Sequence, residues 1–78
     1  MDVDGVKVKL TATTNEDFEY LEGEVGTLFA SVGQRFCFER NNGKRLLSSK
    51  IAEIEFPIGD KIKISTKNST YFFKKIDL

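Results

Sequence analysis

Five basic side chains gather around one predicted hairpin, and residues of this type and spacing can bind anions such as phosphate groups. Three of them flank the tip sequence NNG, and the other two lie on the strands below it. Phosphate contacts by arginine and lysine depend on salt and carry no base specificity. Charged residues at a sheet margin also serve solubility and edge protection, so this simpler explanation stands beside the binding one. The five residues of this basic hairpin are Arg35, Arg40, Lys44, Arg45 and Lys50.

An acidic segment is the second candidate binding surface. It can dock a basic partner or imitate a phosphate backbone, and it can equally be a solvated loop. Residues 1–33 carry seven acids and two lysines, whereas residues 34–78 carry ten bases and five acids. Contact between these two regions in different copies would give weak, salt-sensitive self-association. The carboxylates of the acidic segment belong to Glu16, Asp17, Glu19, Glu22 and Glu24.

The composition gives little support to catalysis. The 78 residues include no histidine, which excludes Ser-His and Cys-His nucleophile pairs. The only cysteine, Cys37, permits neither an intramolecular disulfide nor a thiolate zinc site. Its place between Phe36 and Phe38 on a predicted strand indicates a packed thiol, not a reactive one. We therefore expect a protein that is not an enzyme and that uses neither a metal nor another cofactor.

Length and composition indicate one domain, residues 1–78, with a thin core. A chain of this length buries about 60–65 % of the surface that its unfolded form exposes, so its large rings matter for stability. Twelve bases balance twelve acids, which argues against a dedicated nucleic-acid packager. The first ten residues carry two acids and no long apolar run. We expect no signal peptide, no membrane span and a cytoplasmic location.

Alternation of apolar and polar residues with a period of two predicts short strands along most of the chain. EVGTLFASVG is interpreted as a well-buried strand in which Gly26 forms a bulge, and KRLLSSKIAEIEF as a strand with a kink near residues 48–49. The first strand, in GVKVKLTATT, is expected to turn Val6, Val8, Leu10 and Ala12 inward and Lys7, Lys9, Thr11 and Thr13 outward.

Residues 15–22 are open to two interpretations. Asn15 can cap a short helical turn that ends before Gly23, or the same residues can form an acidic strand with Phe18 and Tyr20 turned inward. We prefer the turn.

PIGD predicts a turn, and KIKIST and TYFFKKI predict a final hairpin. The expected fold is all-β, a small antiparallel barrel or roll of five to six strands, SH3-like or OB-like, which hides its strand edges.

The sequence NNG allows two registers for the hairpin that bears the basic residues. A two-residue loop would place Arg40 opposite Arg45. A three-residue loop with Gly43 left-handed would place Glu39 opposite Arg45 and Phe38 opposite Leu46. Like charges directly opposite each other are unfavourable, so we prefer the second register.

The C-terminal sequence KIKISTKNSTYFFKKI resembles the ending of many small uncharacterised proteins carried by bacteriophages, plasmids and other mobile elements. The pattern T-x-N-S-x-Y carries the resemblance, through Thr66, Asn68, Ser69 and Tyr71. GKRLLSSKIAEIE resembles the strand pair that precedes this ending, so the likeness covers the chain from about Gly43 onward. The resemblance implies a small bacterial β-domain, and it attaches neither an activity nor a functional residue.

Elimination and fold-level analogy favour a non-catalytic binding module that acts through protein contact. The resemblance to proteins of mobile elements implies that such a module is a regulatory or host-directed adaptor. The alternative is a nucleic-acid-binding barrel in which the basic hairpin holds phosphates while an exposed aromatic ring stacks on bases. The two hypotheses differ in where the aromatic rings of the barrel point. They also differ in partner, a protein in the first and nucleic acid in the second, and neither involves a membrane.

Overall fold

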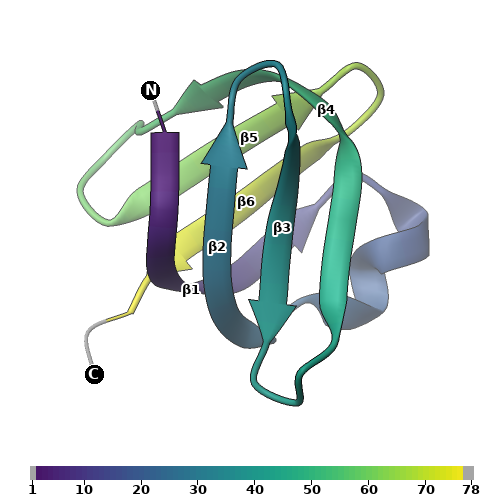
Figure 1. The fold of residues 1–78 in the computed structure, drawn as a ribbon, viewed down its shortest axis with the longest axis vertical. Helices are drawn as coiled ribbons and strands as arrows, with labels where there is room; N and C mark the ends of the chain where they lie inside the picture. Colours follow the sequence, from purple (N-terminus) through teal and green to yellow (C-terminus); the bar gives the residue numbers. More distant parts are fainter. Residues whose placement is uncertain (1, 77–78) are drawn as a thin grey trace.

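Six antiparallel strands form a closed barrel in the computed structural model, which describes residues 2–76. Each strand pairs with the next along the chain, and the last pairs with the first (Figure 1). This confirms the predicted small antiparallel barrel, and its up-and-down order lacks the Greek-key crossover of an OB-fold. The elements are β1 (Asp2–Thr13), the 3-10 helix η1 (Glu16–Leu21), β2 (Val25–Ser31), β3 (Arg35–Arg40), β4 (Arg45–Glu55), β5 (Lys61–Thr66) and β6 (Thr70–Lys75).

Four aromatic rings fill the centre of the barrel. Phe36, Phe38, Tyr71 and Phe73 are all buried, as the alternation on β3 and β6 predicts. The Phe36 ring meets Tyr71 and Phe73 edge to face, with centroid distances of 4.8 and 5.7 Å. Rings in this geometry attract each other beyond the area that they bury. The interior is therefore occupied by the chain's own side chains.

The end of β1 differs from the predicted alternation. Ala12, expected inside, is exposed, and Thr13, expected outside, is buried. The pairing with β6 shifts register between Leu10 and Ala12, so one extra residue reverses which side chains face the core. The Thr13 hydroxyl is satisfied there by donating to the Thr70 carbonyl oxygen at 3.1 Å.

A second irregularity confirms the kink predicted near residues 48–49. Between β3 and β4, Cys37 pairs with Leu47 and Arg35 pairs with Lys50, so β4 carries an extra residue there. The buried Ser48 hydroxyl accepts the Phe36 backbone N–H at 3.0 Å. A side chain thus takes the place of the backbone acceptor that the bulge removes.

Gly26 has a different role from the predicted bulge. It pairs regularly with Val8 on one side and with Arg40 on the other. A Cβ at this position would run into the Glu39 carbonyl oxygen and lie 3.0 Å from the Arg40 Cα. Glycine is needed here because the backbones of β2 and β3 approach too closely for any side chain.

Strand β2 is buried on one side only, which corrects the expectation of a well-buried strand. Leu28 and Ala30 face the core, whereas Phe29 is exposed on the outer surface. An antiparallel sheet with one solvated face gives this alternation.

The segment before β2 is the predicted helical turn. The Asn15 side chain accepts the Asp17 backbone N–H at 3.0 Å, and Gly23, with φ of +93°, follows the helix. Leu21 is buried in the core, while Tyr20 is exposed. Within residues 2–76 no helix has the length and apolar character needed to cross a membrane.

Candidate binding surfaces

The β3–β4 hairpin has the three-residue loop that charge pairing favours. Glu39 lies opposite Arg45 and Phe38 opposite Leu46. The Arg40 backbone N–H donates to the Lys44 carbonyl oxygen at 2.8 Å, and φ of Gly43 is +84°. The preferred register is therefore confirmed.

Arg40 does not share the outer surface of the basic hairpin. Alternation along β3 turns it to the same side as the buried Phe38, and its side chain is only 13 % exposed. Its guanidinium lies 3.9 Å from the Glu24 carboxylate, while its Nε is buried and has no hydrogen-bond partner among residues 2–76. The basic hairpin and the acidic segment thus meet within one chain at this point.

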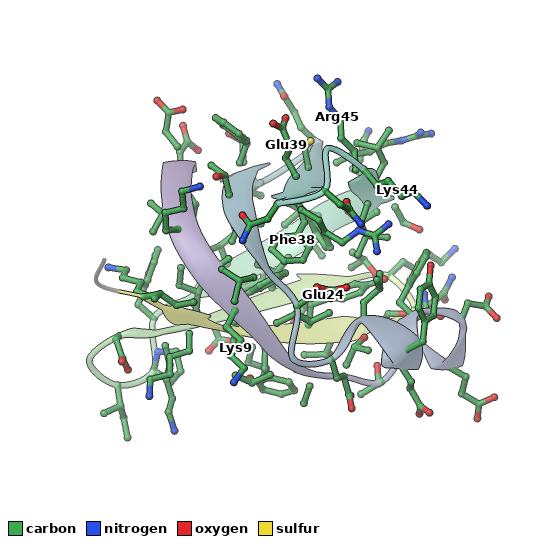
Figure 2. All side chains as sticks on the ribbon, turned by 90° about the horizontal axis from the view of Figure 1, so that it is seen from below. Lys9, Glu24, Phe38, Glu39, Lys44 and Arg45 are labelled. Atoms are coloured by element: carbon green, nitrogen blue, oxygen red, sulfur yellow. The ribbon has the colours of Figure 1, made fainter. Side chains whose placement is uncertain are left out.

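The other four residues of the basic hairpin occupy separate places along it. Arg45 pairs with Glu39 at 3.4 Å, and Lys44 is exposed in the loop; Figure 2 shows these three residues on one side of the barrel. Arg35 and Lys50 lie directly opposite each other, further up the hairpin, and both are exposed. Within residues 2–76, Arg35 and Lys50 are therefore one adjacent pair of predicted cations without an ion pair, and Lys44 in the loop has none either.

The acidic segment is partly used in folding. The Glu22 carboxylate accepts the Thr13 backbone N–H at 3.0 Å, and Glu24 faces Arg40. The remaining three carboxylates, at positions 16, 17 and 19, lie in the first turn of η1. Carboxylates in that position stabilise the positive end of a helical turn.

A row of exposed apolar side chains crosses three strands on the outer surface. Phe29 on β2 lies opposite Cys37 on β3, and Cys37 lies opposite Leu47 on β4. Phe29 is 42 % exposed, Leu47 is 56 % exposed and Cys37 is half-buried between them. We call Phe29, Cys37 and Leu47 the apolar row. Adjacent exposed apolar side chains mark interaction surfaces more often than single ones do.

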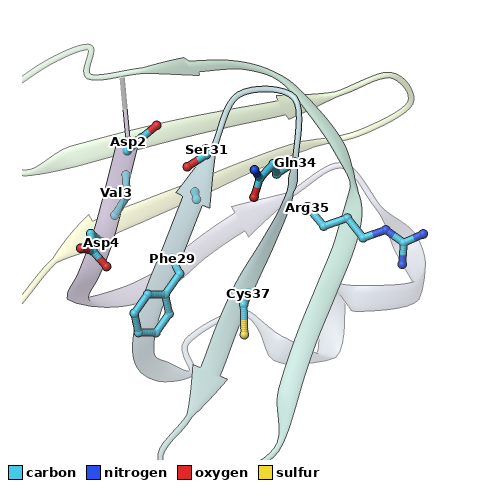
Figure 3. Close-up of a pocket in the computed structure, with 9 residues that line it drawn as sticks. Asp2, Val3, Asp4, Phe29, Ser31, Gln34, Arg35 and Cys37 are labelled. Carbon is cyan, nitrogen blue, oxygen red and sulfur yellow. The ribbon is translucent and has the colours of Figure 1, made fainter.

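A cavity of about 220 Å³ adjoins the apolar row. Figure 3 shows Asp2 and Asp4 on its β1 side, Phe29 over β2 and the Cys37 thiol on β3. The Arg35 side chain points away from the two carboxylates, across β4 (Figure 3). The apolar row is thus bordered by acids at one end and by Arg35 along its flank.

A second row, which sequence reasoning missed, consists of lysines on the opposite side of the barrel. Lys74 on β6 lies directly between Lys9 on β1 and Lys61 on β5, and all three are exposed. Within residues 2–76 no carboxylate lies within ion-pair distance of them. Each directly opposed pair of like charges costs up to about 1 kcal/mol. We call Lys9, Lys61 and Lys74 the lysine row.

A groove of about 470 Å³ runs beside the lysine row. Lys61 and Lys74 stand at it, and its lining is otherwise mostly apolar. Figure 2 shows Lys9 pointing away from the side that carries Lys44 and Arg45. Besides the two lysines and Thr11, the residues that line the groove are Ala12, Pro57, Phe72 and the buried Ile62 and Phe73.

Glu53, on the outer face of β4, has a raised pKa. A side-chain hydrogen bond with Glu55, together with the charge of Glu55, raises the pKa of Glu53. Lys63 opposes this effect, and it forms an ion pair with Glu55 at 3.7 Å. Two neighbouring carboxylates on one fully solvated face account for the shift without a catalytic role.

The residues of the apolar row and of the lysine row can be found in the sequence, but they are recognised as neighbours only once the pairing register of the strands is known. The three members of the lysine row come from three different strands, Lys9, Lys61 and Lys74. Each lysine alone is an ordinary polar residue in an alternating pattern.

No protein-family model, no curated protein and no solved structure matches this chain.

Proposed function

We propose that this protein is a non-catalytic binding module that acts through protein contact. The observation that carries the proposal is the apolar row, Phe29–Cys37–Leu47, on the outer face of β2, β3 and β4. A closed barrel needs no apolar side chains on its outside, because its core is filled by inward-facing residues. Exposed apolar side chains that are grouped on one face mark interaction surfaces, and aromatic residues often anchor a partner protein there.

The charges around the apolar row indicate what kind of partner fits it. Arg35 and Lys50 are opposed cations on the same face, one step along the strands from Cys37. A partner segment that places apolar side chains on the apolar row and carboxylates on this pair would relieve their repulsion. We therefore propose an acidic segment with apolar anchors as the partner, bound by the part of the basic hairpin that remains unneutralised.

Several features support protein contact over nucleic-acid binding at the hairpin. The four rings at positions 36, 38, 71 and 73 are buried, so none of them can stack on a base. Two of the five predicted phosphate-binding residues, Arg40 and Arg45, already face glutamates. An SH3-like form of the barrel, a cytoplasmic location and a role as a regulatory or host-directed adaptor of a mobile element are part of the proposal, the last from the C-terminal resemblance.

The test is affinity capture from a bacterial lysate treated with nuclease, using the tagged wild-type protein and two variants. Leu47→Lys places a charge within the apolar row, and Ile58→Lys makes the same change at an exposed residue of the β4–β5 loop. We expect a protein that remains bound after nuclease treatment, is retained by Ile58→Lys and is lost with Leu47→Lys.

Two results would overturn the proposal. In one, both variants retain the same proteins as the wild type. In the other, everything captured disappears after nuclease treatment. Sedimentation of the purified protein at low and physiological salt identifies a further alternative: dimers abolished by Leu47→Lys would show that the apolar row binds a second copy of this chain instead.

A further inference from the structure

The lysine row lies where neither folding nor edge protection accounts for it. Lys9 and Lys61 each directly oppose Lys74, so the row brings like charges together on three neighbouring strands. Lysines often guard the exposed edges of sheets against aggregation. The barrel is closed, however, and β1, β5 and β6 each have a hydrogen-bonded neighbour on both sides. Within residues 2–76 no side chain relieves this repulsion, which leaves room for solvent ions or a bound polyanion.

The spacing of the row suits a chain of negative charges. Neighbouring strands lie about 4.8 Å apart, so the three lysine positions span about 10 Å across the sheet. Their side chains are flexible and solvated, and an ammonium group binds phosphate as a point charge without demanding fixed geometry. The row thus fits a repeating anion and not a single small ion.

The groove beside the lysine row provides an apolar surface, which a phosphate backbone alone would not need. Lys61 and Lys74 stand at its rim, and Phe72 lies on the outer face between Ala12 and Lys63. The groove, of about 470 Å³, is large enough to receive a flat, apolar group. A base has such a face, and aromatic side chains on small barrels bind unpaired bases by stacking.

A second groove that also includes Lys74 limits where a bound anion can lie. This groove is lined by Lys9, Lys74 and Lys75, but also by Asp60. Repulsion by Asp60 disfavours an anion deep in this second groove. The phosphates would therefore follow the lysine row while the bases point into the apolar groove beside Phe72.

From this geometry we propose that the lysine row and the groove at Phe72 form a binding site for single-stranded nucleic acid. This site lies apart from the apolar row, so it is independent of the proposed protein contact. It also differs from the basic hairpin, because Lys9 points to the other side of the barrel (Figure 2). A duplex is excluded from the groove, since its bases are stacked and paired and cannot turn toward Phe72.

The test is fluorescence anisotropy of a labelled oligothymidylate titrated with the purified protein at several salt concentrations. With three phosphates neutralised, log K should fall against log salt with a slope of about −2, because each contact to a single strand contributes about 0.7. The triple variant Lys9→Gln, Lys61→Gln, Lys74→Gln should bind about tenfold more weakly or worse. Phe72→Leu should lower the affinity about fivefold or more while leaving the salt slope unchanged.

A second triple variant is the matched control. Arg35→Gln, Lys44→Gln and Lys50→Gln remove the same charge from exposed positions of the basic hairpin, and this variant should keep the wild-type affinity. Circular dichroism of every variant verifies that the barrel is folded. Equal losses in both triple variants would overturn the location of the site. Equal affinity for a duplex of the same sequence, or equally good competition by polyglutamate, would overturn the identity of the ligand.

Discussion

Replacing Phe36 by leucine tests whether the aromatic cluster holds the barrel together. Phe36 is fully buried, and its ring meets Tyr71 at 4.8 Å and 80° and Phe73 at 5.7 Å and 86°. Each edge-to-face contact is worth about 0.5–1.5 kcal/mol beyond area burial. Leucine loses both contacts and leaves a small void, so we expect the free energy of unfolding to fall by about 2–3 kcal/mol.

A domain of this length has a total stability of about 4–12 kcal/mol, so Phe36→Leu should still fold. Its melting temperature should drop by about 10–20 °C, since 1 kcal/mol corresponds to about 4–8 °C in a domain of this size. Urea unfolding followed by far-UV circular dichroism measures the change. Near-UV circular dichroism reports the packing of Tyr71, whose ring Phe36 contacts.

The matched control is Phe29→Leu, the same chemical change on the outer face. Phe29 is 42 % exposed, so its unfolding free energy should change by no more than about 0.5 kcal/mol. Equal effects of the two substitutions, or a Phe36→Leu variant as stable as the wild type, would refute the view that the interior rings carry the stability.

Three further changes test particular contacts. Gly26→Ala should lower the free energy of unfolding in urea by about 1–3 kcal/mol, because the Cβ of the new alanine would meet the Glu39 carbonyl oxygen. An unchanged unfolding midpoint would contradict the close approach of β2 and β3. Lys74→Gln should raise the unfolding free energy by up to about 2 kcal/mol, because it removes two opposed pairs, and added salt should remove this gain if repulsion is its cause. Glu53→Gln should stabilise the protein at neutral pH, because Glu55 raises the pKa of Glu53 and the native state binds that proton more tightly than the unfolded state. The gain should vanish as the pH falls below the ordinary glutamate pKa of about 4.3, and a gain that persists in acid would show another cause.

Local pattern was sufficient for most of the barrel. Alternation identified the strands, Asn15 and Gly23 marked the helical turn, and the NNG tip together with charge pairing selected the hairpin register. In each case the physical preference acts between residues close in sequence. The kink at residues 48–49 also followed from local signals, because two serines interrupt the apolar alternation of β4.

The failures share a cause that is not local. Ala12 and Thr13 exchange faces because of a register shift against β6, far along the chain. Gly26 is fixed by the carbonyl of Glu39 on a neighbouring strand, and a bulge was the wrong interpretation of a glycine in a strand. Phe29 lies on a strand that was expected to be well buried, whereas the one-sided burial of an antiparallel barrel leaves it on the outer surface.

The same reasoning explains why net charge was a poor guide to the candidate binding surfaces. Twelve bases and twelve acids cancel in the composition. Binding of a charged partner, however, depends on which charges the fold leaves without an opposite charge beside them. Arg40 and Arg45, prominent in the sequence, are neutralised by Glu24 and Glu39.

Lysines that look ordinary along the chain are brought into opposition by strand pairing, at Lys9, Lys61 and Lys74. Since four rings occupy the barrel interior, a ligand has to bind on the outside, where cross-strand register decides which side chains become neighbours. In this closed barrel, therefore, the strand register decides which side chains group on the outer surface, and composition and sequence order do not show these groups.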